Sequence, residues 1–148
     1  MSHDSYSEIN LHVVWHTKTS MPLLTPRVET FVHHYVRHRL LAEEGIIVYA
    51  VGGTETHIHV ALSIPPTVLI SELIGRIKGS AAHEANRQFA VSGKVLEWQR
   101  GYGVVSFGTR QLPWVKEYVE NQREHHARGT VQQRLELAAL PGEQKETS

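Results

Sequence analysis

Apolar and polar positions follow two different rhythms along this chain, and the changes between them predict the order of its elements. Residues 9–17 alternate apolar and polar side chains and then run apolar, which predicts a first strand. Residues 26–44 repeat apolar side chains at the spacing of one helix face. Thr25 and Pro26 are typical of a helix start, and Gly45 is typical of a helix end. The apolar stripe consists of Val28, Phe31, Val32, Tyr35, Val36 and Leu40.

The middle of the chain predicts a hairpin followed by a second helix. A β-branched run at residues 46–51 is typical of a strand, and the glycines at 52–53 predict a turn. The apolar run at residues 56–64 then returns as the second arm of an antiparallel hairpin. Beyond Pro65–Pro66, residues 67–89 are periodic like a helix. Their buried stripe would be Leu69, Ile70, Leu73, Ile74 and Ile77.

The last third of the chain predicts a fourth strand at residues 101–108 and a third helix at residues 110–126. Residues 128–148 predict a weak helix and a polar tail. The order β-α-β-β-α-β matches the split βαβ, or ferredoxin-like, arrangement. We therefore expect an α+β fold, with one antiparallel sheet, helices on one face and an added C-terminal helix. No repeat or linker divides the chain, so we expect one domain over residues 1–148 with a core at 8–127.

Composition narrows the function classes without selecting one. The chain has 148 residues, of which 41% are hydrophobic and 20% charged, as in ordinary globular domains. It has no cysteine, which excludes disulfides and thiolate metal sites. We expect a cytoplasmic protein without a membrane span, because no long apolar stretch and no signal-peptide pattern occur. The net charge of zero disfavours binding of long duplex nucleic acid by charge alone, but permits a small local groove.

The strand predicted at residues 56–64 carries the strongest chemical signal, the pair His57 and His59. Alternate side chains of a strand share one face, so the two imidazoles project side by side. Ile58 and Val60 point the other way, into the core. Two imidazoles on one face form half of a metal site. The chain has eleven histidines, so the pair could also arise by chance. Further candidate ligands elsewhere in the chain would favour a metal site.

The predicted third helix supplies such a partner segment. Residues four apart share a helix face, so Tyr118, Gln122 and His126 project together. Val115 and Val119 form a separate stripe that can pack on the core. Two imidazoles and an amide oxygen would bind a divalent ion, which would withdraw charge from a phosphodiester. Beside that positive centre a tyrosine hydroxyl becomes a usable nucleophile, and its product would be a covalent phosphotyrosine.

Five short motifs occur in a characteristic order along the chain. They are His12–Lys18 (HVVWHTK), Gly52–Glu55 (GGTE), Lys78–Ser80 (KGS), Trp98–Gly103 (WQRGYG) and Tyr118–His126 (YVENQREHH). In their joint order and spacing, the chain resembles the single-tyrosine HUH transposases of the insertion-sequence 200/605 type. It is also similar to the related transposases associated with repetitive extragenic palindromes (REPs). The resemblance extends from about Leu11 to His126.

The resemblance implies a metal-dependent DNA transposase that cleaves and rejoins single-stranded DNA through a 5′-phosphotyrosine intermediate. It implies His57, His59 and Gln122 as ligands of Mg²⁺ or Mn²⁺, and Tyr118 as the nucleophile. It further implies recognition of hairpin or palindromic element ends, a homodimer, and association with the nucleoid when DNA is bound. Thr56 departs from the acidic or amide residue common at its position, which bears on the orientation of His57.

Several other residues compete for these roles or extend them. Tyr102 is a weaker candidate nucleophile, because no glutamine lies one helical turn away. Glu55 is a candidate ligand if the strand extends that far, and His126 could reach the metal or a DNA phosphate. The candidate phosphate contacts, each of which could also be an ordinary surface charge, are Lys18, Arg76, Lys78 and Arg100.

Two other classes with His-x-His motifs are excluded by the residues themselves. Histidine-triad nucleotide hydrolases continue to a third histidine, where this chain has Ala61. Two-histidine phosphoesterases need a second His-x-Thr or His-x-Ser repeat, and His16-Thr17-Lys18 beside His57-Ile58-His59 does not supply the pair. The remaining alternative is a non-cleaving DNA-hairpin-binding protein derived from such a transposase. The four intact site residues favour the enzyme, and the zero net charge favours the binding protein.

Overall fold

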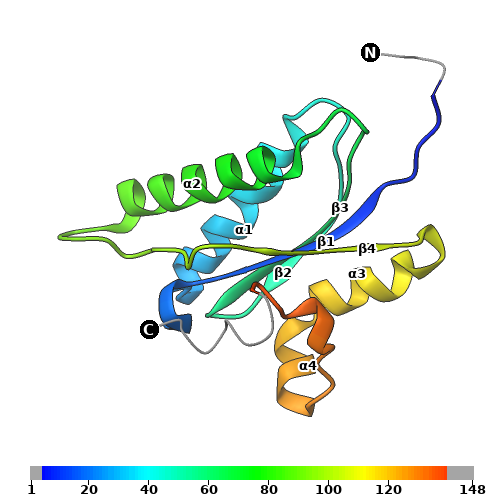
Figure 1. Cartoon of the computed structure of the whole chain (residues 1–148). Helices are drawn as coiled ribbons and strands as arrows, with labels where there is room; N and C mark the ends of the chain where they lie inside the picture. The colour runs from blue at the N-terminus through cyan, green and yellow to red at the C-terminus, as the bar shows by residue number, and fades with distance from the viewer. Residues whose placement is uncertain (1–4, 140–148) are drawn as a thin grey trace.

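A computed structural model describes residues 5–139, and its four strands form one antiparallel sheet (Figure 1). The strands are β1 (Asn10–His16), β2 (Ile47–Gly53), β3 (His57–Ser63) and β4 (Gly103–Phe107). Their spatial order is β2-β3-β1-β4, with β1 and β3 at the centre. The four predicted strands and the ferredoxin-like α+β fold are therefore confirmed.

One face of the sheet is covered by two long helices, α1 (Pro26–Leu41) and α2 (Ile70–Phe89) (Figure 1). The predicted stripes of both helices face inward, where Val32 and Ile77 are fully buried. Leu69 is the exception: it precedes α2 as its N-cap and is 60% exposed, so its predicted burial is wrong. They pack against Trp15, Ile58 and Val60 of the central strands in one large apolar core. Burial of this apolar surface is the main contribution to the stability of the fold. None of the helices within residues 5–139 has the length and apolar character needed to cross a lipid bilayer.

The other face of the sheet carries two shorter helices, α3 (Leu112–Glu120) and α4 (Gln122–Arg128) (Figure 1). Val115 and Val119 of α3 are buried on one stripe, as expected, but they form a small apolar cluster with two alanines of the sheet, separate from the large core. The backbone of α3 comes unusually close to β2 at Gly52. A Cβ atom there would lie 1.9 Å from the carbonyl oxygen of Val119, so only glycine permits this approach.

The prediction of one continuous helix over residues 110–126 is wrong. The chain leaves helical geometry at Asn121 (φ −117°, ψ 39°), which separates α3 from α4. The Asn121 amide donates hydrogen bonds of 3.0 Å to the Glu117 carbonyl oxygen and 2.9 Å to its carboxylate. An asparagine side chain that bonds to nearby backbone in this way competes with helix continuation. Gln122 therefore begins a new helix instead of continuing the turn above Tyr118.

The predicted weak helix and polar tail at residues 128–148 is only partly a tail. We call residues 131–139 the C-terminal segment; it contains a short 3₁₀ turn, Gln133–Leu135, and buries the side chains of Leu135 and Ala138. The segment lies close against β4 at Gly103. A Cβ atom at this position would be 1.8 Å from the Leu137 carbonyl oxygen, so glycine is required there. The remainder of the predicted tail, residues 140–148, lies outside the described residues.

Candidate metal and nucleophile site

The two histidines of β3 lie on the face of the sheet that α3 and α4 cover. His57 and His59 are buried, and their ring centroids are 4.9 Å apart. Ile58 and Val60, between and beyond them, belong to the core on the opposite face. The alternation predicted from the strand pattern is therefore confirmed, and both imidazoles face the same space.

Two threonines hold the ring of His57. The Thr56 and Thr54 hydroxyl oxygens lie 2.9 Å and 3.1 Å from His57 Nδ1. This contact leaves Nε2 directed away from the hairpin, toward the space shared with His59. Burial, followed by the neighbouring His59, lowers the pKa of His57 to about 3, so the ring is neutral and able to act as a ligand. Thr56 thus contacts the outer nitrogen of a histidine, as a residue that orients a ligand does.

His12 of β1 plays the same part for His59, and the sequence reasoning missed it. His12 Nε2 lies 2.7 Å from His59 Nδ1, and both rings are buried. Burial lowers the pKa of both histidines, that of His12 to about 3. His59 Nε2 is buried and has no hydrogen-bond partner within residues 5–139. The missed signal was the alternation of Asn10, His12 and His16 on one face of β1, opposite β3.

Tyr118 and Gln122 both reach this space despite the helix break. Gln122 Oε1 lies 3.3 Å from His57 Nε2, and its amide donates a 2.9 Å hydrogen bond to the Tyr118 carbonyl oxygen. The Tyr118 ring centroid lies 6.0 Å from that of His59. Its hydroxyl accepts a 2.9 Å hydrogen bond from the Gln132 amide and donates one to Glu136. Burial and Glu136 raise the pKa of Tyr118, and the side chain has 0% exposure.

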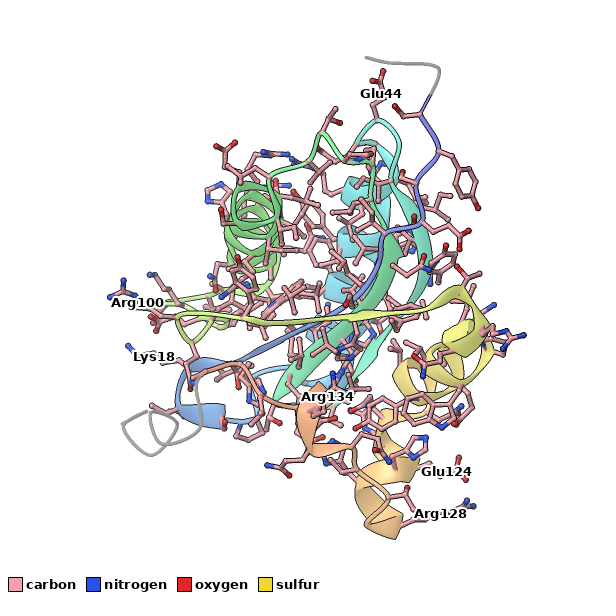
Figure 2. All side chains as sticks on the ribbon, turned by 45° about the vertical axis from the view of Figure 1, so that its right-hand side comes forward. Lys18, Glu44, Arg100, Glu124, Arg128 and Arg134 are labelled. Carbon is pink, nitrogen blue, oxygen red and sulfur yellow. The ribbon has the colours of Figure 1, made fainter. Side chains whose placement is uncertain are left out.

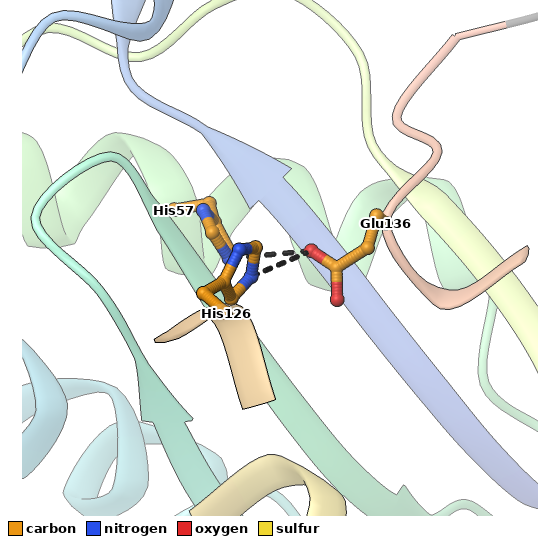
Figure 3. A group of neighbouring side chains, drawn as sticks. All are labelled: His57, His126 and Glu136. Atoms are coloured by element: carbon orange, nitrogen blue, oxygen red, sulfur yellow. Dashed lines mark ion pairs between the residues drawn. The ribbon is translucent and has the colours of Figure 1, made fainter. Parts of the chain in front are cut away.

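Two further side chains complete the cluster. His126, expected only as a candidate, has Nε2 3.2 Å from Gln122 Oε1. Glu136 was missed, because it lies in what the sequence presented as a polar tail. Its Oε1 lies 3.3 Å from Nε2 of His57 and of His59, and 3.5 Å from Nε2 of His126. Figure 3 shows the carboxylate directed at His57 and His126, and these three residues form a group able to hold a metal ion.

The four candidate phosphate contacts do not form one surface. Lys78 donates to the carbonyl oxygens of Gln99 and Gly101, at 3.0 Å and 2.8 Å, so it braces the loop before β4. Arg76 pairs with Glu43 at 2.7 Å on the α1–α2 side. Lys18 and the exposed Arg100 lie at one edge of the molecule (Figure 2), where the Lys18 amide donates to the Glu97 carbonyl oxygen. Their contact with DNA stays a prediction.

Two other sequence candidates lie away from the cluster. Tyr102 packs against the core between the sheet and α1–α2, on the far face from the histidine pair. The Glu55 carboxylate is half exposed and pairs with Arg123 at 3.7 Å. Neither residue shares an interaction with His57 or His59.

A cavity of about 400 Å³ opens beside the buried tyrosine. Its walls come from β1, β4, α3 and the C-terminal segment, and they include His12, Phe107, Trp114, Gln132 and Arg134. Trp114 is 47% exposed and stacks on the Tyr118 ring, with centroids 5.5 Å apart and planes at 14°. An exposed aromatic face therefore lies next to the cluster.

Comparison with known families decides the family of this chain. The family model described as "Transposase IS200 like" matches residues 5–122, which include the histidine pair, Tyr118 and Gln122. The chain belongs to the IS200-like transposases. The family match ends before His126 and Glu136, so the carboxylate of the cluster lies outside the part that matches. A search of curated proteins returned no match to this chain.

Two solved structures share the fold of this family member. A proposed transposase from Deinococcus radiodurans R1 matches with a TM-score of 0.65 at 19% identity, over 82% of this chain and 96% of the other. A REP-associated tyrosine transposase bound to a REP hairpin matches with a TM-score of 0.60 at 14% identity, over 85% of this chain and 74% of the other. At these identities the likeness shows the common fold alone.

Proposed function

We propose that this IS200-like transposase cleaves and rejoins single-stranded DNA, with Tyr118 as the nucleophile and a metal ion bound by His57, His59 and Gln122. The observation that carries the proposal is the convergence of the tyrosine hydroxyl and the histidine Nε2 atoms on one partly buried carboxylate. A hydroxyl nucleophile beside a ligand set is the arrangement that metal-assisted phosphoryl transfer needs.

The residues present fit a divalent transition ion. His59 Nε2 is a buried nitrogen without a hydrogen-bond partner in the described chain, and His57 Nε2 points into the same space. Imidazole nitrogens with an amide oxygen suit Mn²⁺ better than Mg²⁺, which prefers oxygen ligands. When bound, the ion would withdraw charge from the phosphodiester under attack. His12, Thr54 and Thr56 orient the two ligand rings through their outer nitrogens.

The proposed reaction conserves the energy of the broken strand. The Tyr118 oxygen forms a bond to phosphorus and loses its proton, while the bond from phosphorus to the 3′ oxygen breaks. The departing 3′ oxygen takes up a proton, and the 5′-phosphate stays on the tyrosine. Attack of a 3′-hydroxyl on the phosphotyrosine reverses these steps and rejoins DNA.

The proposed substrate is DNA with a hairpin or palindrome next to a single strand. One solved relative of the same fold is described as bound to a REP hairpin, which supports this class of DNA. The exposed face of Trp114 beside Tyr118 supplies a platform on which an unpaired base can stack.

We also propose a homodimer, which size-exclusion chromatography with light scattering tests directly. Within one chain, Tyr118 already lies beside its own histidine pair.

The burial of Tyr118 favours the second candidate, a DNA-hairpin-binding protein that does not cleave. A DNA strand cannot reach the Tyr118 hydroxyl while Gln132 and Glu136 cover it. Cleavage therefore requires the C-terminal segment to move. A protein that only binds the hairpin needs no such movement.

A gel assay separates the two candidates. The purified protein is incubated with labelled single-stranded oligonucleotides from its own flanking DNA, with Mn²⁺ or with a chelator. We expect a metal-dependent band that survives denaturant, which Tyr118→Phe abolishes while hairpin binding stays near wild type. Tyr102→Phe is the matched control and should leave the covalent band intact. A shifted band that is lost in denaturant both with Mn²⁺ and with chelator, and no cleavage of the oligonucleotide, would support the binding protein instead.

A further inference from the structure

Glu136 is held in the cluster by two hydrogen bonds, one to its backbone and one to its side chain. Its carbonyl oxygen accepts a 3.0 Å hydrogen bond from His16 Nε2, which anchors the backbone to β1. Its Oε2 accepts the hydrogen bond of the Tyr118 hydroxyl. Its side chain is 12% exposed, so the carboxylate is almost withdrawn from water. A charged group this buried needs compensation, either by hydrogen bonds to both oxygens or by a cation.

The second carboxylate oxygen, Oε1, has neighbours but no hydrogen bond. It lies 3.3 Å from Nε2 of His57 and of His59 and 3.5 Å from Nε2 of His126. Within the described residues, none of these contacts has hydrogen-bond geometry, and His59 Nε2 has no hydrogen-bond partner. The ring nitrogens therefore do not aim at Oε1 itself. They and Oε1 surround a common space, as ligands around one ion do.

The spacing of these atoms is that of neighbouring ligands on one ion. Bonds of about 2.1 Å to a shared metal place adjacent ligand atoms roughly 3.0 to 3.4 Å apart. The separations from Glu136 Oε1 to the three imidazoles are 3.3 Å, 3.3 Å and 3.5 Å. Those from Gln122 Oε1 to His57 and His126 are 3.3 Å and 3.2 Å. Glu136 Oε1 and Gln122 Oε1 thus lie at ligand spacing from the imidazoles around them, and His57, His126 and Glu136 lie mutually close enough to hold one ion.

We propose that Glu136 is a ligand of the metal ion in the DNA-free protein, with Oε1 on the ion and Oε2 holding the Tyr118 hydroxyl. This inference rests on the proposed metal site, and it adds an anionic ligand from outside the residues that match the family. One carboxylate then ties the metal to the nucleophile, so the C-terminal segment docks most firmly when the ion is bound. Glu136 acts on Tyr118 as a positioning residue.

Binding of Mn²⁺ to the full chain without DNA tests the proposal, by calorimetry and by the electron paramagnetic resonance signal of free Mn²⁺. We expect Glu136→Gln to weaken Mn²⁺ binding by about tenfold or more, because an anionic ligand is lost. Glu124→Gln is the matched control, since that carboxylate is half exposed and pairs with Arg128 at 2.6 Å. It should bind Mn²⁺ like wild type. Thermal unfolding of each variant checks that it is folded.

A second variant tests the docking of the C-terminal segment without changing Glu136. Gly103→Ala places a methyl group against the Leu137 carbonyl oxygen and should lift the C-terminal segment off β4. We expect it to weaken Mn²⁺ binding as Glu136→Gln does, with the carboxylate still present in the chain.

The outcomes separate this proposal from the proposed function. Wild type that binds Mn²⁺, with Glu136→Gln binding equally well or more tightly, overturns the role of Glu136 and leaves the histidine site intact. Tighter binding would identify the carboxylate as a group that competes with the ion. Wild type that binds no Mn²⁺ overturns both proposals.

Discussion

The two faces of the sheet are built from the same strands, yet different forces hold them together. On the α1–α2 face, Ile58 and Val60 enter a large apolar core that needs no particular partner for any one side chain. On the opposite face, His57 and His59 meet threonine, histidine and glutamine side chains at hydrogen-bond or ligand distances. The apolar cluster that the described residues form there is small, with four buried members.

The α1–α2 face supplies most of the stability of the fold, and the opposite face positions the polar groups of the candidate site. Apolar burial is non-directional and tolerant of small shifts, so the α1–α2 face can stabilise the whole fold. Polar contacts depend on direction and distance, so the opposite face places its groups well but adds little stability. The segments carrying Tyr118 and Glu136 dock on that face through close backbone approaches at Gly52 and Gly103.

The largest expected effect comes from the polar face. We expect His57→Ala to lower Mn²⁺ affinity by more than about 100-fold, since a direct ligand should matter more than the outer contacts that cost 10–100-fold. Metal-dependent cleavage should be lost with it, while the unfolding transition stays cooperative. Calorimetry and the gel assay measure both. Full cleavage by this variant in Mg²⁺ would rule out the metal-site assignment.

The neighbouring residue should give the opposite result. Ile58→Ala removes a fully buried side chain from the large core, and we expect it to lower the free energy of unfolding by about 2–5 kcal/mol. Mn²⁺ binding of the folded variant should change little, because Ile58 points away from the site. Urea denaturation gives the stability. A loss of metal binding at temperatures where the variant is folded would contradict the separation of the two faces.

A smaller effect is expected where α3 meets the sheet. Gly52→Ala adds a methyl group against the Val119 carbonyl oxygen, and overpacking of this kind costs about 1–3 kcal/mol. Because α3 carries Tyr118, the variant should also lose covalent attachment of DNA. Gly75→Ala is the matched control, since no atom lies within 4 Å of its added Cβ. That control should stabilise α2 by about 1 kcal/mol, and thermal unfolding measures both variants.

Most features that depend on local sequence patterns were predicted correctly, and features that depend on particular side-chain contacts were missed. Strand alternation and helix periodicity are local, and they correctly predicted the four strands, α1, α2 and a histidine pair on the face opposite the large core. The break at Asn121 was missed, because helix periodicity continues through it while one side chain bonds back to Glu117. His12 was missed because its role depends on the register between β1 and β3.

The sequence by itself determined the fold class, the two faces of each strand and the side-by-side placing of His57 and His59. These features depend on which side chains are apolar and how they are spaced, and this information is local. Only the tertiary structure decided that His126 and Glu136 join that site and that Tyr118 is covered. The physical reason is that Glu136 reaches the histidines through a backbone approach at Gly103, far from it in sequence. No periodicity in a polar segment records such a contact.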